Sequence, residues 1–245
     1  MTRRRWIAEH WDEATATLTG AQAEHMTRVL RAQPGVEADV VAGGRVFHAE
    51  VVAVSTSEVR FNLIAELDAD PALPVTLLIS VYKFDHMEWA LEKATELGVA
   101  AIAPMIARRT EKHLAQTAEK RMERWRRIVH EAAQQARRSD VPLIHDLAPL
   151  NTRVRAASAS MATRIVLAEQ ERTTTLRTAI EEAVNAAGAE TPALEIAIGP
   201  EGGWAPEEEA LFDANGWRAV SLGPRILRAE TAAIAALAVI ASCLE

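Results

Sequence analysis

The sequence predicts an α/β protein with two domains: a small, mostly β module over residues 1–70 and a larger domain with a mostly parallel sheet over residues 75–245. Short β-like runs around a Gly-Gly pair fill the first segment. Buried strands alternate with helices in the second, and such alternation is typical of parallel sheets. Between the two, Pro71 and Pro74 end an acidic stretch, so residues 71–74 are expected to form a linker.

The first module is expected to hold one helix and three strands. Thr19 and Gln22 have the spacing of a capping box and open a helix that runs through Arg31. The strands are expected at Val36–Ala42, Arg45–Ala53 and Glu58–Leu67. Gly43 and Gly44 form a two-residue turn between the first two strands, because glycine permits the positive φ that such turns need.

The second domain alternates strand and helix. Its first strand, Val75–Val81, is a continuous apolar run of the kind that is covered on both faces of a sheet. Further strands are expected at Ala100–Met105, near Ile144, at Ile165–Leu167, at Leu194–Ile198 and at Ala219–Leu222, with helices at Asp85–Leu97, Ala118–Arg138 and Thr174–Ala187.

Two glycine-rich turns carry the strongest functional signal. Ile198–Trp204 (IGPEGGW) and Leu222–Thr231 (LGPRILRAET) each end a buried strand and precede a helix-like segment. Both turns are therefore expected at the carboxyl ends of adjacent parallel strands, where open α/β sheets bind ligands. Arg228 and Glu230 in the second turn are either a surface ion pair or a functional pair at the mouth of the crevice.

The glycines do not match a nucleotide phosphate loop. No Gly-Lys-Ser/Thr is present, and no third glycine stands at the dinucleotide-binding spacing. Pro206 followed by Glu207, Glu208 and Glu209 is typical of a helix N-terminus, and these acids would repel a phosphate. The turns thus favour a neutral or cationic ligand held by backbone groups. Glu201 is either a hydrogen-bonding group of its turn or a ligand contact.

The formal net charge of −7 argues against indiscriminate nucleic-acid binding, but residues 108–138 carry ten Lys/Arg against four Glu. In a helical projection Met122, Trp125 and Val129 fall on one side with Ala132 and Ala136. The opposite side carries Lys120, Arg124, Arg127, Glu131, Gln134 and Arg138. This stripe is equally well read as a solvated face or as a surface for phosphate contact.

Other classes of function find little support. The seven histidines show no metal-ligand spacing, and no Gly-x-Ser-x-Gly elbow is present, so no metal is expected. The apolar run Ala232–Leu244 is too short to span a bilayer, so no membrane partner is expected. A single cysteine indicates a reducing compartment, and the protein is predicted to be cytoplasmic.

At these residues the chain resembles the small-subunit ribosomal RNA methyltransferase E family, within the SPOUT superfamily of knotted methyltransferases. The two glycine-rich turns carry the resemblance. Further matches are Glu96–Val99 before Pro104, Glu131 with Gln135, Arg138 and Pro142, and His25–Arg31 with Gly35. Two departures stand out: Ala205 replaces a serine or threonine that would cap a helix, and Ala229 replaces a threonine.

The resemblance implies an N-terminal PUA-like β-barrel that binds RNA and a C-terminal trefoil-knotted domain that binds S-adenosylmethionine. It also implies a homodimer that methylates uridine N3 in 16S ribosomal RNA of the 30S subunit, near the decoding region. The cofactor-binding residues would be Leu167, Gly199, Pro200, Glu201, Gly202, Leu222, Gly223, Ile226, Leu227 and Thr231. The RNA-binding residues would be Arg3, Arg4, Arg5, Arg31, Arg124, Arg127 and Arg138.

The catalytic residues would be Arg228, which stabilises charge on the uracil carbonyl oxygens, and Glu230, which orients Arg228 or accepts the N3 proton. Two rival functions remain open. One is a non-catalytic RNA-binding or ribosome-assembly factor with the same knotted fold. The other is an α/β enzyme that acts on a small metabolite without RNA.

Overall fold

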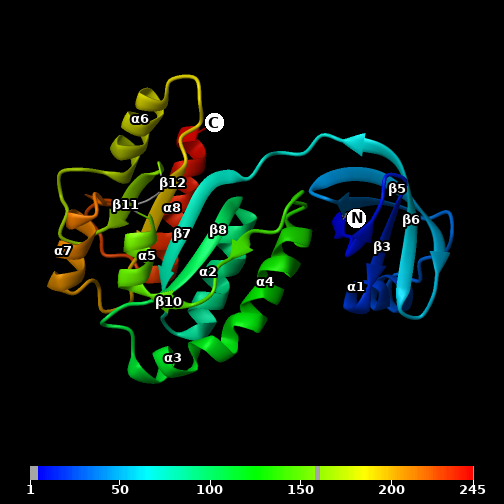
Figure 1. Ribbon diagram of the computed structural model, residues 1–245, viewed down its shortest axis with the longest axis horizontal. Coiled ribbons are helices and arrows are strands. Elements are labelled where there is room, and N and C mark those ends of the chain that lie inside the picture. Colours follow the sequence, from blue (N-terminus) through cyan, green and yellow to red (C-terminus); the bar gives the residue numbers. More distant parts are fainter. Residues whose placement is uncertain (1–4, 158–160, 245) are drawn as a thin grey trace. The chain divides into compact units, whose positions relative to one another are not determined.

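The computed structural model describes residues 5–157 and 161–244, and contacts divide the chain into two compact units (Figure 1). Unit 1 comprises residues 1–71 and 131–141, and unit 2 comprises residues 72–130 and 142–245. The sequence boundary at residue 70 thus leaves out a segment from the middle of the chain that packs within unit 1. Arg3 and Arg4 lie outside the described residues.

Unit 1 is built on a six-stranded, mostly antiparallel sheet. Its order is β1 (Arg5–Ile7), β4 (Glu37–Ala42), β5 (Arg45–Val54), β6 (Glu58–Leu67), β3 (Thr15–Thr19) and β2 (His10–Trp11), with only β1 and β4 parallel among these pairs. The two edge strands are separated in sequence only by Ala8 and Glu9. Ala8 N donates to Val41 O at 2.9 Å and Glu9 N donates to Thr17 O at 3.2 Å. Because only two residues connect the two edge strands, β1 and β2 must lie close together, and the sheet curls into a half-barrel.

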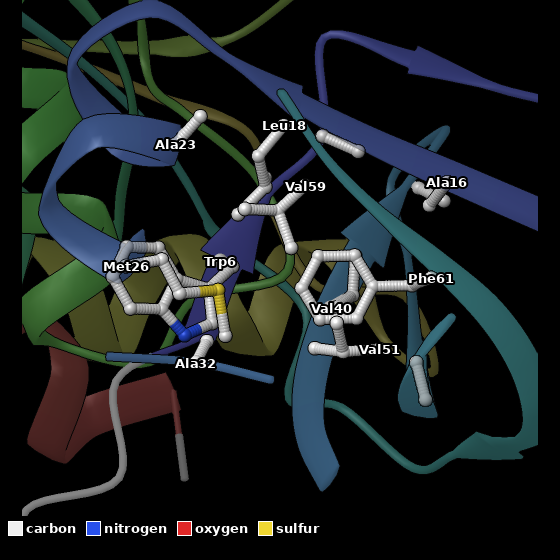
Figure 2. Close-up of a cluster of buried hydrophobic side chains, with 13 residues drawn as sticks. Trp6, Ala16, Leu18, Ala23, Met26, Ala32, Val40, Val51, Val59 and Phe61 are labelled. Carbon is white, nitrogen blue, oxygen red and sulfur yellow. The ribbon is translucent and has the colours of Figure 1, made fainter. Parts of the chain in front are cut away.

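The inside of this half-barrel is filled by apolar side chains (Figure 2). Leu18 of β3 and Val59 and Phe61 of β6 are fully buried, as the period-2 alternation of half-buried strands requires. Figure 2 shows Met26 and Trp6 closing one end of the cluster. The core of unit 1 therefore comes from its strands and from the helical segment that follows β3.

That helical segment is shorter than the sequence predicts. It consists of α1 (Gly20–Glu24) and a π-helical turn (His25–Val29), and Arg31 has a φ of 53°, so the chain reverses before the predicted end. Thr19 has extended backbone and makes no side-chain cap, so the predicted capping box is absent. The Gln22 amide instead donates to Ile7 O at 2.9 Å, which ties α1 to β1.

Unit 2 is built on a parallel sheet. The order is β10 (Ala148–Pro149), β8 (Val99–Ile106), β7 (Leu73–Ser80), β12 (Leu194–Ile198), β11 (Thr163–Leu167) and β13 (Arg218–Val220), and the two-residue β9 (Leu143–Ile144) also pairs with β8. The predicted linker is partly wrong, because Leu73 and Pro74 already belong to β7. Leu73 N donates to Gly98 O at 2.8 Å, and proline is tolerated near the start of a strand.

The two strands that precede the glycine-rich turns are not adjacent, contrary to the sequence expectation. β11 lies between β12 and β13 and pairs with both in parallel. Each strand alone is a short buried run, and its pairing partner is decided by the path of the chain, which no local pattern records. The carboxyl ends of three strands, not two, therefore form this edge of the sheet.

Helices cover both faces of the sheet. On one face Leu78 and Ala197 pack with α5 (Leu150–Ala157), α7 (Pro206–Ala214) and a row of three aromatic rings. In that row the rings meet edge to face, with 4.9 Å between the ring centres of Trp204 and Phe212 and 5.3 Å between those of Phe212 and Trp217. On the other side α8 (Ala229–Leu244) packs against α2 (Phe84–Glu96), α6 (Leu176–Ala187) and β12.

The predicted long helix over Ala118–Arg138 is broken. The segment begins with a 3₁₀ turn (Ala118–Arg121), continues as α4 (Met122–Gln135) and stops being helical before Arg138, and α3 (Lys112–Thr117) precedes it. The predicted apolar side is buried at Met122, Trp125 and Val129, but Gln134 and Arg138 are buried rather than exposed. They belong to residues 131–141 of unit 1, where the Gln134 side-chain amide donates to Gln22 Oε1, so a helix projection could not place them.

Candidate active site

A pocket of about 460 Å³ lies in unit 2 at the carboxyl ends of β11, β12 and β13. The residues predicted from sequence that line it are Leu167, Gly199, Pro200, Glu201, Leu222, Gly223, Ile226, Leu227 and Arg228. Lining residues that the sequence reasoning missed include Lys83, His86, Ala168, Glu169, Arg172, Ile198, Ser221 and Arg225. Ala168, Glu169 and Arg172 line the pocket because β11 lies between the other two strands, whereas Lys83 and His86 reach it from the start of α2.

The first glycine loop, residues 199–204, forms one wall. It is closed by a turn in which Gly203 N donates to Pro200 O at 2.9 Å, with a φ of 68° at Gly203. Trp204 Nε1 donates to Leu167 O at 2.8 Å, which fastens the loop to the end of β11. A Cβ on Gly199 would lie 3.2 Å from the Trp204 ring, so this glycine is needed for close packing.

Gly202, predicted as a cofactor contact, is not among the residues that line the pocket. It lies against Arg109, whose Nη1 donates to Gly202 O at 2.9 Å, and a Cβ added there would lie 3.3 Å from the Arg109 Cβ. The requirement for glycine at this position is therefore steric, and it comes from the outer side of the loop.

The acids at the start of α7 also lie away from the pocket lining. The Glu208 carboxylate is buried and accepts from Ala205 N at 2.9 Å and from Arg108 N at 2.7 Å. It thus performs one half of a capping box and ties α7 to the segment after β8, while Ala205 provides no side-chain cap. The three acids at the start of α7 therefore do not face the crevice, contrary to the sequence expectation. The acids that line the pocket are Glu169 and Glu201.

The second glycine loop, residues 222–228, forms the opposite wall. The Ser221 hydroxyl accepts from Gly223 N at 2.9 Å, and Gly223 has a φ of 117°. Ile226 is 73% exposed although it lines the pocket, and Arg228 is exposed beside it. Thr231, predicted as a cofactor contact, lies exposed in the first turn of α8 and does not line the pocket.

The loop after β11 closes the site between these walls. The Glu171 carboxylate accepts from Thr173 N and the Thr173 hydroxyl, both at 2.6 Å, and from Thr174 N at 2.9 Å. These hydrogen bonds lower the pKa of Glu171 to about 2. The same loop presents Glu169 and Arg172 to the pocket.

A cluster of ionisable groups lies beside the pocket, where α2 begins. His86 Nδ1 is 3.3 Å from Glu230 Oε1 and 3.8 Å from Glu201 Oε1, and Lys83 Nζ is 3.5 Å from Glu201 Oε2. Burial raises the pKa of the Tyr82 hydroxyl, and the charges of Glu230 and Glu201 raise it further. The cluster joins residues from three distant parts of the sequence, and no spacing pattern could have indicated it.

Glu230 does not meet Arg228, the partner that the sequence hypothesis gave it. Glu230 is 5% exposed and is absent from the pocket lining, whereas Arg228 is exposed and lines the pocket. Within the part of the chain that the structure describes, the ion-pair partner of Glu230 is His86. The two residues predicted to be catalytic therefore lie in different surroundings.

The predicted RNA-binding arginines divide between the two units. In unit 1 Arg31 is exposed, and Arg5 donates to Arg137 O at 2.5 Å. Arg138 is 9% exposed and forms a bidentate ion pair with the Asp140 carboxylate, with hydrogen bonds of 3.0 and 2.6 Å. Little of its guanidinium surface is therefore accessible to a phosphate.

In unit 2 the remaining two predicted arginines are exposed on α4. Arg124 binds the Glu88 carboxylate through two hydrogen bonds of 2.8 and 2.7 Å, and Arg127 lies nearby on the same helix. The positive stripe is thus partly neutralised by its own carboxylate neighbours.

Over residues 5–157 and 161–244 no helix is long and apolar enough to cross a membrane, and no group of His, Cys, Asp or Glu forms a cluster suited to a metal ion.

The chain is similar to proteins that modify RNA. Residues 69–241 match the model of the RNA methyltransferase domain family. Proteins described as ribosomal RNA small subunit methyltransferase E are 35% identical in Synechocystis, over 95% of this chain and 75% of that protein, and 32% identical in Bacillus subtilis, over 92% and 89%.

Solved structures agree with these sequence matches. The ribosomal RNA small subunit methyltransferase E of Neisseria gonorrhoeae, bound to S-adenosylmethionine, superposes with a TM-score of 0.81 at 28% identity over 98% of this chain and 97% of that one. A putative methyltransferase of Legionella pneumophila with the same cofactor superposes with a TM-score of 0.80, also at 28% identity over 98% and 97%. The chain belongs to the ribosomal RNA small subunit methyltransferase E family.

Proposed function

We propose that this protein transfers a methyl group from S-adenosylmethionine to ribosomal RNA of the small subunit. The observation that carries the proposal is the pocket formed where β11, β12 and β13 end, in a chain whose family and structural relatives are RNA methyltransferases. Its volume of about 460 Å³ falls within the roughly 300–1,000 Å³ typical of small-molecule sites.

The lining suits S-adenosylmethionine in its chemistry. Leu167, Ile198 and Leu227 offer apolar surface for a flat purine, and the ends of three strands offer backbone groups for its polar edge. The carboxylates of Glu169 and Glu201 suit the cationic parts of the molecule. When bound, S-adenosylmethionine would supply a methyl group already activated by its positively charged sulfur.

The proposed target is uridine N3 of 16S ribosomal RNA near the decoding region. N3 is a poor nucleophile until it loses its proton, and the developing negative charge spreads over the two carbonyl oxygens of uracil. Arg228 would donate hydrogen bonds to those oxygens, and its position in the pocket lining and its exposure support this role. A base beside the pocket must take the proton.

Access to N3 requires the uridine to leave its stack or pair, because N3 lies on the pairing edge. A second RNA-binding surface on the protein would offset the free-energy cost of unstacking the uridine. We assign this RNA-binding role to unit 1, a PUA-like barrel in this proposal, through Arg3, Arg4, Arg5 and Arg31. Arg127 of unit 2 is a separate candidate for RNA contact. The trefoil knot, the homodimer and the cytoplasmic location form part of the same proposal.

The rival function is an RNA-binding or ribosome-assembly factor that does not catalyse methyl transfer. The built pocket argues against it, since a protein that only binds RNA needs no cavity lined by both carboxylates and apolar side chains. Titration with S-adenosylmethionine in a calorimeter separates the two: no binding would favour the rival.

The activity test is methylation of 30S subunits that lack the modification, followed by mass-spectrometric mapping of the rRNA. Arg228→Ala is expected to keep its affinity for S-adenosylmethionine and to lose about 100-fold in turnover, as removal of one charge-stabilising donor does. Arg177→Ala, an exposed arginine paired with Glu181 on α6, is the matched control. Normal turnover by Arg228→Ala would remove Arg228 from the mechanism.

A further inference from the structure

His86 is the imidazole that lines the pocket. It lies in the first turn of α2, its side chain is 31% exposed, and it presents one edge to the cavity. Its Nδ1 is buried and has no hydrogen-bond partner within the described part of the chain, although it lies 3.3 Å from Glu230 Oε1 and 3.8 Å from Glu201 Oε1. One ring nitrogen thus faces carboxylates inside the protein, and Nε2 is the nitrogen left for a substrate.

Glu230 is buried in a way that calls for a partner. It is 5% exposed, and within the described part of the chain its Oε2 has no hydrogen-bond partner. An unpaired buried carboxylate is costly, and the imidazole of His86 lies 3.3 Å from Glu230 Oε1. Glu230 is absent from the pocket lining, whereas His86 lines the pocket, so His86 stands between this carboxylate and the cavity.

We propose that His86 is the group that accepts the N3 proton and that Glu230 is its positioning residue. This inference rests on the proposed function. In the step, the N3–H bond breaks and the proton goes to His86 Nε2. The N3 electron pair forms the bond to the methyl carbon, and the carbon–sulfur bond breaks so that its electrons neutralise the sulfur. Glu230 stabilises the imidazolium that results, as carboxylates do behind histidine bases.

Other charges also face His86. Asp85 Oδ2 lies 3.8 Å from Nε2 on the same helix, and Lys83 neutralises part of the charge of Glu201. Tyr82 lies close enough to Glu201 and Glu230 to feel both charges. Glu169, Arg172 and Arg228 line the same pocket from the loops opposite. Asp85 is the competitor for Nε2, and a bound uridine must displace that contact.

The first experiment is the pH dependence of the single-turnover rate on 30S subunits. The wild-type rate is expected to level off at high pH, whereas His86→Gln should fall about 100-fold near neutral pH and then rise about tenfold per pH unit, because hydroxide must replace the lost base. His113→Gln, which removes an imidazole 3.5 Å from Glu111 on the surface, is the matched control with an unchanged profile.

A uniform loss of rate in His86→Gln with the wild-type pH profile would overturn the proposal and leave His86 a purely structural role. Unchanged activity would overturn it as well. Calorimetry shows whether the variant still binds S-adenosylmethionine, and His86→Asn is the second variant if the first does not fold.

The second experiment needs no turnover. ¹⁵N NMR of the full chain reports which ring nitrogen carries the proton in neutral His86. If Glu230 accepts from Nδ1, the Nδ1–H form predominates and Nε2 is free to act as a base, and Glu230→Gln shifts the population towards Nε2–H. An Nε2–H form in the wild type overturns the proposal. Failure of the proposed function appears separately, as a wild type that neither binds S-adenosylmethionine nor methylates 30S subunits.

Discussion

The two glycine loops look alike in sequence but are held in very different ways. The first, residues 199–204, is fixed by the Trp204 side chain, by the Arg109 hydrogen bond to Gly202 O and by its own turn. The second, residues 222–228, is held at its start by the Ser221 hydroxyl, and its tip carries the exposed Ile226 and Arg228. The first wall is anchored in the core through Trp204, whereas the tip of the second wall faces solvent.

This difference indicates that the two loops bind different parts of the reaction mixture. A wall anchored in the core keeps its geometry and suits a small ligand of constant shape. A wall with an exposed apolar tip and an arginine suits a large substrate that arrives from outside, such as a nucleotide that has left its helix. The following predictions test how far the two loops differ.

The largest effect is expected for Trp204→Ala. Trp204 is 7% exposed, meets Phe212 edge to face and fastens the first loop to β11, so its removal should cost about 3–5 kcal/mol in free energy of unfolding. Trp89→Ala is the control because Trp89 is 48% exposed, and it should change stability little. Urea unfolding of both variants checks this. Equal losses would mean that the first loop is not part of the core.

The next effect is expected for Gly203→Ala. With a φ of 68°, an alanine there should cost about 1–2 kcal/mol in stability. Gly188→Ala is the matched control, since Gly188 has a φ of 69° with nothing within 4 Å of an added Cβ. Both should lower the melting temperature alike. Only Gly203→Ala should also weaken binding of S-adenosylmethionine in calorimetry. An equal effect of both variants on binding would contradict the view that the first loop keeps a fixed geometry for the cofactor.

The sequence predicts most of this architecture because most of it is local. The apolar run at Val75–Val81 and the alternation at Glu58–Leu67 locate β7 and β6 closely, and the glycine turns locate two walls of the pocket. Hydrophobic period and turn residues are properties of short segments, so a single sequence displays them.

What the sequence does not predict depends on contacts between distant segments. The position of β11 between β12 and β13 is one case, and the burial of Arg138 with residues 131–141 in unit 1 is another. His86 is the clearest case, since its meeting with Glu201 and Glu230 requires α2, β12 and α8 to converge. The departure at Ala205 is likewise offset by Glu208, whose reach to Arg108 N no local motif encodes.

A smaller effect is expected for Ser221→Ala, which releases the start of the second loop. Gly223 N loses the hydroxyl that accepts its hydrogen bond at 2.9 Å, and since Gly223 is only half-buried, water replaces the partner at a cost of about 1 kcal/mol. Thermal unfolding with and without S-adenosylmethionine measures both stability and affinity. A loss as large as that of Trp204→Ala would show that the two loops are equally well anchored.

The smallest effect is expected for Glu171→Gln, in the loop between the two walls. Hydrogen bonds to the ionised carboxylate lower the pKa of Glu171 from 4.5 to about 2 in the folded protein. The ionised form is therefore favoured by folding, and the stability it contributes is complete above about pH 4.5 and is lost as the pH falls through about 2. The difference in melting temperature between wild type and Glu171→Gln should accordingly be constant from neutral pH to about pH 5 and then shrink on acidification. Glu190→Gln, an exposed carboxylate in the turn before β12, is the control and should show no such pH dependence. A difference that stays constant or grows as the pH falls would mean that the ionised carboxylate of Glu171 does not hold this loop, and that the loop between the two walls depends on other contacts.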